Sequence, residues 1–257
     1  METVVVDYRN IDQEHICCSM SDKKCVAAKK AWLKNNFEDG VVFRKANVQG
    51  KVFIEYMPAD DAWCPVNAPQ YMFINCLWVA GKYQGQGYSK VLLRECIAES
   101  KIKGKIGLVA LTASKKKPYL ADKKYLLHLG FQVADTAEPY FELMYLPFVD
   151  DAPKPSFLDQ AKTGRIEETG WVLYYTHQCP FTAKYVPLAQ EIATELGVDL
   201  RVIKIDVPRD KNAVADPNII HPHAAPCPFT TYSLYHDGKF VTHEIQSEAK
   251  LRKLWQK

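Results

Sequence analysis

The chain has 257 residues, which fits one large domain or two small ones, and its composition of 47% hydrophobic and 25% charged residues is that of an ordinary soluble protein. The formal net charge of +3 at pH 7 is too small to indicate a nucleic-acid partner, and no apolar run approaches the ~20 residues of a membrane span. Eight cysteines without a Cys-x-x-Cys pair, and an N-terminus without a basic segment before an apolar core, favour a cytoplasmic protein with reduced thiols.

Residues 1–147 read as a succession of strands and helices. Val4–Val6 predicts a first strand, and roughly the next thirty residues form a helical pattern that Gly40 ends. The order strand, helices, three strands, helix, strand, helix, two strands indicates an α/β domain with a mixed (α+β) sheet. The later strands are predicted at 41–43, 52–54, 71–79, 106–111, 131–133 and 141–146, with helices from 87 to about 101 and from the basic turn 115–117 to Gly130.

A glycine-bearing turn separates the strand that ends at Val79 from the helix that follows. It reads Tyr83-Gln84-Gly85-Gln86-Gly87-Tyr88-Ser89, and its two glycines allow a tight turn and a close approach to a ligand. Amides of this turn and of the first helical residues lack internal partners and lie beside the positive end of the helix dipole. The turn therefore predicts a phosphate site, with an ordinary strand–turn–helix connection as the alternative. It is not a P-loop, because the Lys-Ser/Thr pair is missing.

This motif and the order of elements resemble the GNAT (GCN5-related) N-acetyltransferases, over a domain that we place at residues 1–148. The family pattern Gln/Arg-x-x-Gly-x-Gly/Ala is matched by Gln84 and Gly87, while Ser89 replaces the last Gly/Ala. The resemblance implies acetyl-CoA as the cofactor, bound where two strands splay apart, and a primary amine on a small molecule or peptide as the partner. It also implies that backbone groups of Leu77 and Val79 pair with the pantetheine arm, and that the pyrophosphate is held by the amides of Gly85, Gln86, Gly87, Tyr88 and Ser89.

The same resemblance leaves the catalytic residues open. The family commonly supplies the acid that protonates the leaving thiolate as the Tyr of a Phe-Tyr-x-x-x-Gly-Phe stretch, but the matching stretch here places Leu126 at that position. We rank Tyr119, expected one turn into the last helix, first and Tyr125 second as substitutes, with simple packing as the alternative for both. The Glu that often serves as base is missing from the strand before the motif. Asp60, Asp61 or water alone could serve instead, but a solvated loop is the favoured interpretation of the two aspartates.

A second domain is predicted after a change of composition at Pro147. Two prolines and adjoining charges indicate a linker over 149–169, and the domain itself spans 170–257. Its pattern of strand, helix and strand, then two strands and a helix capped by Ser247, resembles the thioredoxin fold. A GNAT domain followed by such a domain resembles the YoaP-like acetyltransferases.

Two cysteines of the second domain are candidate redox thiols. Cys179-Pro180-Phe181-Thr182 stands where thioredoxins have Cys-x-x-Cys. Its position at a helix N-terminus favours the thiolate form of Cys179. The same tetrapeptide, Cys-Pro-Phe-Thr, recurs from Cys227. Pro226 or Pro228 resembles the cis-proline of that fold. We hypothesise that Cys179 and Cys227 approach one another and form a disulfide or share a soft metal ion, with two unrelated thiols as the alternative. No dedicated metal site is predicted.

Two functions follow from these patterns. The first is an acetyl-CoA-dependent N-acetyltransferase in which a primary amine attacks the thioester directly and the second domain shapes or regulates the acceptor site. The second is a CoA-binding thiol redox or metal sensor with little transferase activity. The sequence leaves the identity of the amine and the oligomeric state open.

Overall fold

The computed structural model describes residues 1–16, 18, 22–208 and 215–256. Residues 1–147 form a seven-stranded sheet with the order β1-β2-β3-β5-β6-β8-β7, in which both parallel and antiparallel pairs occur, so the predicted α/β class with a mixed sheet is confirmed. None of the helices in the described ranges is both long and apolar enough to cross a membrane. The strands are β1 (Thr3–Val6), β2 (Val42–Ala46), β3 (Val52–Pro58), β5 (Tyr71–Val79), β6 (Gly107–Ala113), β7 (Gln132–Ala137) and β8 (Phe141–Pro147).

The helices of the first half cover the two faces of this sheet. On one face α2 (Tyr88–Ile102) and α3 (Lys123–His128) bury Leu92, Cys96 and Leu126 against the strands. On the other face α1 (Lys23–Asn36) begins after Asp22, whose side chain accepts the amide hydrogens of Lys24 and Cys25, and buries Trp32 and Leu33. The predicted helical pattern before Gly40 is therefore a helix of 14 residues.

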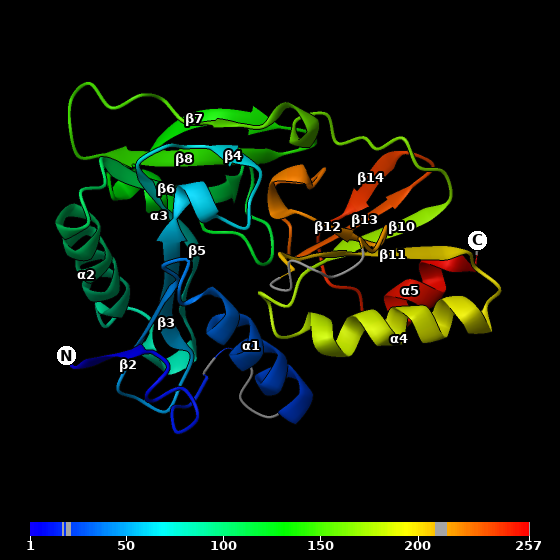
Figure 1. Ribbon diagram of the computed structural model, residues 1–257, viewed down its shortest axis with the longest axis horizontal. Helices are drawn as coiled ribbons and strands as arrows, with labels where there is room; N and C mark the ends of the chain where they lie inside the picture. The colour runs from blue at the N-terminus through cyan, green and yellow to red at the C-terminus, as the bar shows by residue number, and fades with distance from the viewer. Residues whose placement is uncertain (17, 19–21, 209–214, 257) are drawn as a thin grey trace.

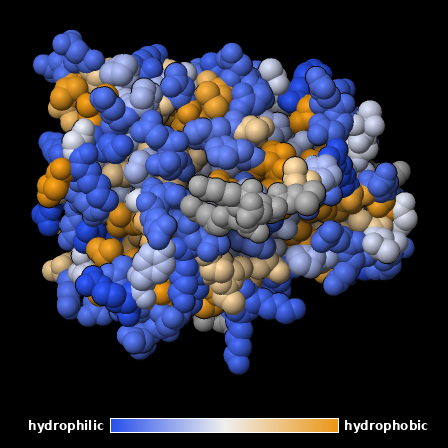
Figure 2. Space-filling model, in the orientation of Figure 1, coloured by the Kyte–Doolittle hydropathy of each residue, from blue (hydrophilic) through white to orange (hydrophobic). Residues whose placement is uncertain are grey.

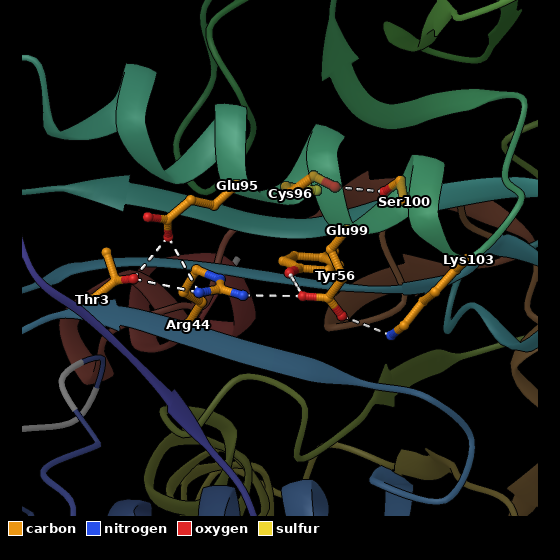
Figure 3. Close-up of polar contacts among 8 residues, drawn as sticks. All are labelled: Thr3, Arg44, Tyr56, Glu95, Cys96, Glu99, Ser100 and Lys103. Atoms are coloured by element: carbon orange, nitrogen blue, oxygen red, sulfur yellow. Dashed lines mark hydrogen bonds and ion pairs between the residues drawn. The ribbon is translucent and has the colours of Figure 1, made fainter.

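Helix α2 is held on the sheet by the polar network that Figure 3 shows. Arg44 on β2 forms ion pairs with Glu95 (3.2 Å) and Glu99 (3.1 Å) of α2. The hydroxyl of Tyr56 on β3 donates to Glu99 (2.7 Å), and Lys103 pairs with the same carboxylate (2.7 Å). Burial acts to raise the pKa of Glu99, but these donors outweigh burial and the pKa lies below its usual value. The network fixes the helix whose N-terminus carries the glycine turn.

The gap that defines the site opens between β5 and β6. These strands pair in parallel from Tyr71 opposite Gly107 to Ile74 opposite Ala110. Beyond that point β5 continues to Val79 and β6 to Ala113 without further pairing between them, as the resemblance implied. On its other edge β5 carries a β-bulge, because Cys76 pairs with Glu55 but Ile74 pairs with Tyr56, which leaves Asn75 as the extra residue.

The second half forms a five-stranded sheet with the order β12-β11-β10-β13-β14. Figure 1 shows it beside the first sheet, with α4 (Thr182–Glu195) and α5 (Glu248–Trp255) next to each other on one face. The predicted order of strand, helix, strand, then two strands and a helix is found; the thioredoxin resemblance stays a prediction. The strands are β10 (Trp171–Tyr175), β11 (Leu200–Ile205), β12 (Ile219–Ile220), β13 (Tyr232–His236) and β14 (Lys239–Thr242).

The free face of the second sheet packs against the first half. Val172 and Tyr174 of β10 and Tyr235 of β13 belong to the same buried cluster as Trp32 and Phe53 of the first half. Alternate residues such as Leu173 face α4 and α5 instead, in a separate cluster. One hydrophobic core therefore joins the two halves, while hydrophilic residues predominate on the face shown in Figure 2.

The first part of the segment predicted as a linker, 149–169, packs along the first half, and residues 164–166 bond to the second half. Its short strand β9 (Ser156–Phe157) pairs with β4 (Val66–Asn67), and Phe157 is buried. The hydroxyl of Tyr71 donates to the carbonyl oxygen of Pro153 (2.8 Å).

Candidate active site

The glycine turn adopts a conformation that favours glycine. Gly85 (φ +75°) and Gly87 (φ +82°) both lie in the left-handed region, and Gly87 is the N-cap of α2 with no side-chain cap. Within the described residues no acceptor is found for the amides of Gly85, Gln86 and Gly87. The side chain of Gln84 donates to the carbonyl oxygen of Val79 (3.1 Å) and so closes the turn against the end of β5. The turn presents amides to solvent, as an anion site requires.

A cavity of about 610 Å³ occupies the gap between β5 and β6, and we call it the groove. Of the residues predicted to bind the cofactor, Leu77, Val79, Gln84 and Ser89 line it. Gly85, Gln86, Gly87 and Tyr88 form the turn between Gln84 and Ser89 but are not among its lining residues. The groove therefore runs from the glycine turn along the unpaired edge of β5.

A second cavity, of about 430 Å³, lies between the two halves of the chain, and we call it the pocket. The first half contributes residues of α1, β3 and β5, and the second half contributes Cys179, Phe181 and Thr231 among others. The pocket and the groove share several wall residues, among them Asn75, Cys76 and Tyr119, so a ligand in one can reach a ligand in the other along this shared wall.

A buried ion pair lines the wall of the pocket. Lys29 of α1 and Glu55 of β3 approach to 2.5 Å, and their side chains are 3% and 2% exposed. Lys29 Nζ also donates to the carbonyl oxygen of Gln178 in the second half (2.6 Å), and Asn75 Nδ2 donates to Glu55 Oε1 (3.2 Å). Sequence reasoning missed Glu55; its signal is one carboxylate inside the apolar strand Val52-Phe53-Ile54-Glu55-Tyr56-Met57. Asp60 and Asp61 are exposed and line neither cavity, which agrees with a solvated loop.

Tyr119 lies where the groove and the pocket meet, but in a loop rather than in the predicted helix. Helix α3 begins only at Lys123, because the Asp122 side chain caps it by accepting the amide hydrogen of Tyr125. Tyr119 has φ +65°, a strained conformation for a bulky side chain of the kind found at functional sites. Burial, then the nearby Cys179, raises the pKa of its hydroxyl, which therefore carries its proton at neutral pH.

The loop that carries Tyr119 is held by the second half. His243, fully buried, lies 2.9 Å through Nε2 from the carbonyl oxygen of Pro118, the residue before Tyr119. Because a carbonyl oxygen only accepts, Nε2 carries the proton, and Nδ1 accepts from the hydroxyl of Tyr140 (2.7 Å). Burial lowers the pKa of His243, in keeping with a neutral imidazole.

Tyr125, the second candidate, lines the groove but not the pocket. Its hydroxyl oxygen is buried and has no hydrogen-bond partner among the described residues. Leu126, which takes the position of the family's tyrosine, is 3% exposed and belongs to the core beneath α3. Tyr119 is thus the candidate that borders both cavities.

Cys179 and Cys227 pack in different hydrophobic clusters. Cys179 packs with the cluster under α4 and α5, whereas Cys227 lies in the core shared with the first half, where Cys64 is its thiol neighbour. Both are free thiols. Burial raises the pKa of Cys179 to about 11 and that of Cys227 to about 12, so the expected thiolate at the helix N-terminus is wrong: burial outweighs the helix dipole.

One further expectation for the second half, the cis-proline, is wrong. The cis peptide bond of the described chain precedes Pro139, so neither Pro226 nor Pro228 is a cis-proline. No group of three or more His, Cys, Asp or Glu side chains that could hold a metal ion occurs among the described residues.

Two family models match separate parts of the chain. The family model described as "Acetyltransferase (GNAT) family" matches residues 10–131, and the model described as "YoaP-like" matches residues 222–253. A protein of Bacillus subtilis (strain 168), described as the uncharacterized N-acetyltransferase YoaP, is 42% identical over 248 residues, which cover 95% of this chain and 94% of that protein.

Solved structures are more distant. The PaiA N-acetyltransferase of Thermoplasma acidophilum in complex with coenzyme A is 14% identical, with a TM-score of 0.41 over 57% of this chain and 99% of that one. The GNAT family N-acetyltransferase YhbS of Escherichia coli in complex with CoA is 16% identical, with a TM-score of 0.41 over 62% of this chain and 89% of that one.

Proposed function

Because the chain belongs to the GNAT family of N-acetyltransferases, we propose that it transfers the acetyl group of acetyl-CoA to a primary amine by direct attack, in a pocket completed by its second half. The observation that carries the proposal is the junction of the groove and the pocket at Asn75, Cys76 and Tyr119. One cavity suits a long cofactor entering along a strand edge, and the other suits a small acceptor that meets it at the reacting end.

The residues present fit acetyl-CoA, which supplies the activated thioester when bound. The unpaired amides of Gly85, Gln86 and Gly87 suit its pyrophosphate, and the open edge of β5 at Leu77 and Val79 suits the amide groups of its pantetheine arm.

Glu55 is the residue that we propose as proton acceptor for the attacking amine. An amine attacks only in its neutral form and loses a further proton after attack. The Oε1 atom of Glu55 faces Asn75 at the junction, while Lys29 holds Oε2, so the carboxylate is fixed beside the place where the amine must lie. Glu55 takes the proton directly or through one water.

Tyr119 is the residue that we propose as proton donor to the leaving thiolate. Its hydroxyl is protonated at neutral pH, and its side chain borders both cavities. His243 acts through the backbone as a positioning residue for Tyr119, which gives the second half a direct role in the reaction.

Turnover by the full chain tests this assignment. Release of the CoA thiol from acetyl-CoA is followed with a panel of primary amines, and Glu55→Gln and Tyr119→Phe are each expected to lower kcat by about 10²–10⁴ with unchanged acetyl-CoA affinity. Unchanged kcat in both variants would refute these roles. A sensor role through thiols has less support, because the raised pKa values of Cys179 and Cys227 keep both thiols protonated at neutral pH.

A further inference from the structure

Six aromatic side chains line the pocket. Its aromatic side chains come from both halves of the chain, and they are Phe53, Trp78, Tyr119, Phe181, Tyr185 and Phe229. Aromatic walls bind a flat apolar body well, because stacked and edge-on contacts add to the burial of apolar area.

One polar atom at the junction has no partner. Asn75 directs Nδ2 at the Glu55 carboxylate, and this contact fixes the amide orientation, since the reverse orientation would place two acceptor oxygens together. Its Oδ1 atom is buried and has no hydrogen-bond partner among the described residues. A buried carbonyl oxygen without a donor is costly, and an amine N–H of the acceptor would satisfy it. The amine end of the acceptor is thereby placed beside Asn75.

The pocket also carries an unbalanced positive charge. The charges of Lys29 and Glu55 cancel, but Lys51 also lines the pocket and forms no ion pair within the described ranges. Lys51 Nζ lies 5.5 Å from the ring centroid of Phe181, on the second half. Because Lys51 and Glu55 are four positions apart along extended chain, their Cα atoms are separated by about 13 Å. The backbone of Lys51 is thus well separated from that of Glu55, and its ammonium group lies beside Phe181.

We propose that the acceptor is an amine with a single cationic nitrogen, an aromatic body and an anionic group at the end remote from the amine. The amine contacts Asn75 and Glu55, the body fills the aromatic pocket, and the anionic group pairs with Lys51. A second cation in place of the anionic group is repelled by Lys51, so polyamines are poor acceptors. This inference rests on the proposed transferase function.

The test uses three acceptors that share one body: 4-(2-aminoethyl)benzoate, 2-(4-methylphenyl)ethylamine and 4-(2-aminoethyl)benzylamine, with spermidine as a fourth. The kcat/KM of the full chain for the benzoate is expected to be about five- to tenfold higher than that for the methyl compound, because one partly exposed charge pair contributes about that much. The kcat/KM for the diamine is expected to be the lowest of the three. Lys51→Glu is expected to reverse the order of the benzoate and the diamine. The control is Lys154→Glu, which makes the same charge change at an exposed lysine outside both cavities and should leave the order of the acceptors unchanged.

The outcomes separate this inference from the proposed function. A preference for the diamine or spermidine, or an order that Lys51→Glu leaves unchanged, overturns the substrate class while transfer itself stands. Acetyl-CoA binding without turnover of any of the three aromatic amines also overturns it. Failure to bind acetyl-CoA would instead refute the proposed function.

Discussion

The buried Lys29–Glu55 pair should behave as a coupled unit. Its side chains are 3% and 2% exposed, so replacing one partner leaves the other charge without a counter-charge in the interior. Breaking such a pair costs about 3–5 kcal/mol. We expect Glu55→Gln and Lys29→Met each to lower the free energy of unfolding by about 3 kcal/mol. The low end applies because Lys29 also contacts the Gln178 carbonyl, and the amide of the Glu55→Gln variant still hydrogen-bonds.

The assay is urea unfolding of the two single variants and the double variant, followed by tryptophan fluorescence, for which Trp32 is a reporter 4.3 Å from Lys29 Nζ. The loss in free energy of unfolding of the double variant is expected to be about 2 kcal/mol smaller than the sum of the losses in the two single variants. The exposed pair of Lys34 and Asp12, with side chains 39% and 72% exposed, is the matched control, and its coupling should stay below about 1 kcal/mol. Additive effects for Lys29 and Glu55 would refute the reasoning.

Substitutions at three further residues, His243, Glu99 and Cys179, have defined expected outcomes. His243→Phe should lower kcat several-fold with little change in acetyl-CoA affinity, and His243→Gln should recover part of the kcat. Turnover assays measure kcat, and calorimetric titration with acetyl-CoA measures the affinity. Burial lowers the folded-state pKa of His243, so the free energy of unfolding of the wild type falls as the pH drops below 6.5. His243→Phe should lack this part of the loss when unfolding is measured against pH. Equal pH dependence of stability in the two proteins would contradict a buried neutral imidazole. The pKa of Glu99 is lowered in the fold, so the stability that its carboxylate contributes is present above pH 4.5 and is lost below it. Glu99→Gln should therefore lose less stability on acidification than the wild type. An equal loss of stability in both proteins would count against the network. Cys179→Ser should retain acetyl transfer, whereas loss of all transfer would favour a thiol-based role.

Features set by local chain chemistry were predictable from the sequence. The turn at Gly85 and Gly87 follows from residues that lie next to one another, and the gap between β5 and β6 followed from the family resemblance that this motif carries. The helix expected over Tyr119 failed locally, because Asp122 starts the helix later than the periodicity suggests.

Features set by packing between distant segments were not predictable. Glu55 acquires its role from Lys29 on another element and from a bulge at Asn75 that the strand pattern does not reveal. Cys179 and Cys227 are free thiols that belong to different hydrophobic clusters, so their pairing stays a prediction. The expected thiolate at Cys179 is wrong because its burial depends on the whole fold. His243 is recognisable as a positioning residue only once the two halves are in contact.

The most direct test of the central claim is a calorimetric titration of the full chain with acetyl-CoA, repeated with Gly87→Glu and Gly104→Glu. Both glycines have positive φ (+82° and +68°) and open space around a Cβ, so the two changes impose similar strain and the same charge, at opposite ends of α2. We predict that the wild type and Gly104→Glu bind alike, while Gly87→Glu loses binding because its carboxylate fills and repels the pyrophosphate site. No binding by the wild type, or equal binding by all three, would contradict the account.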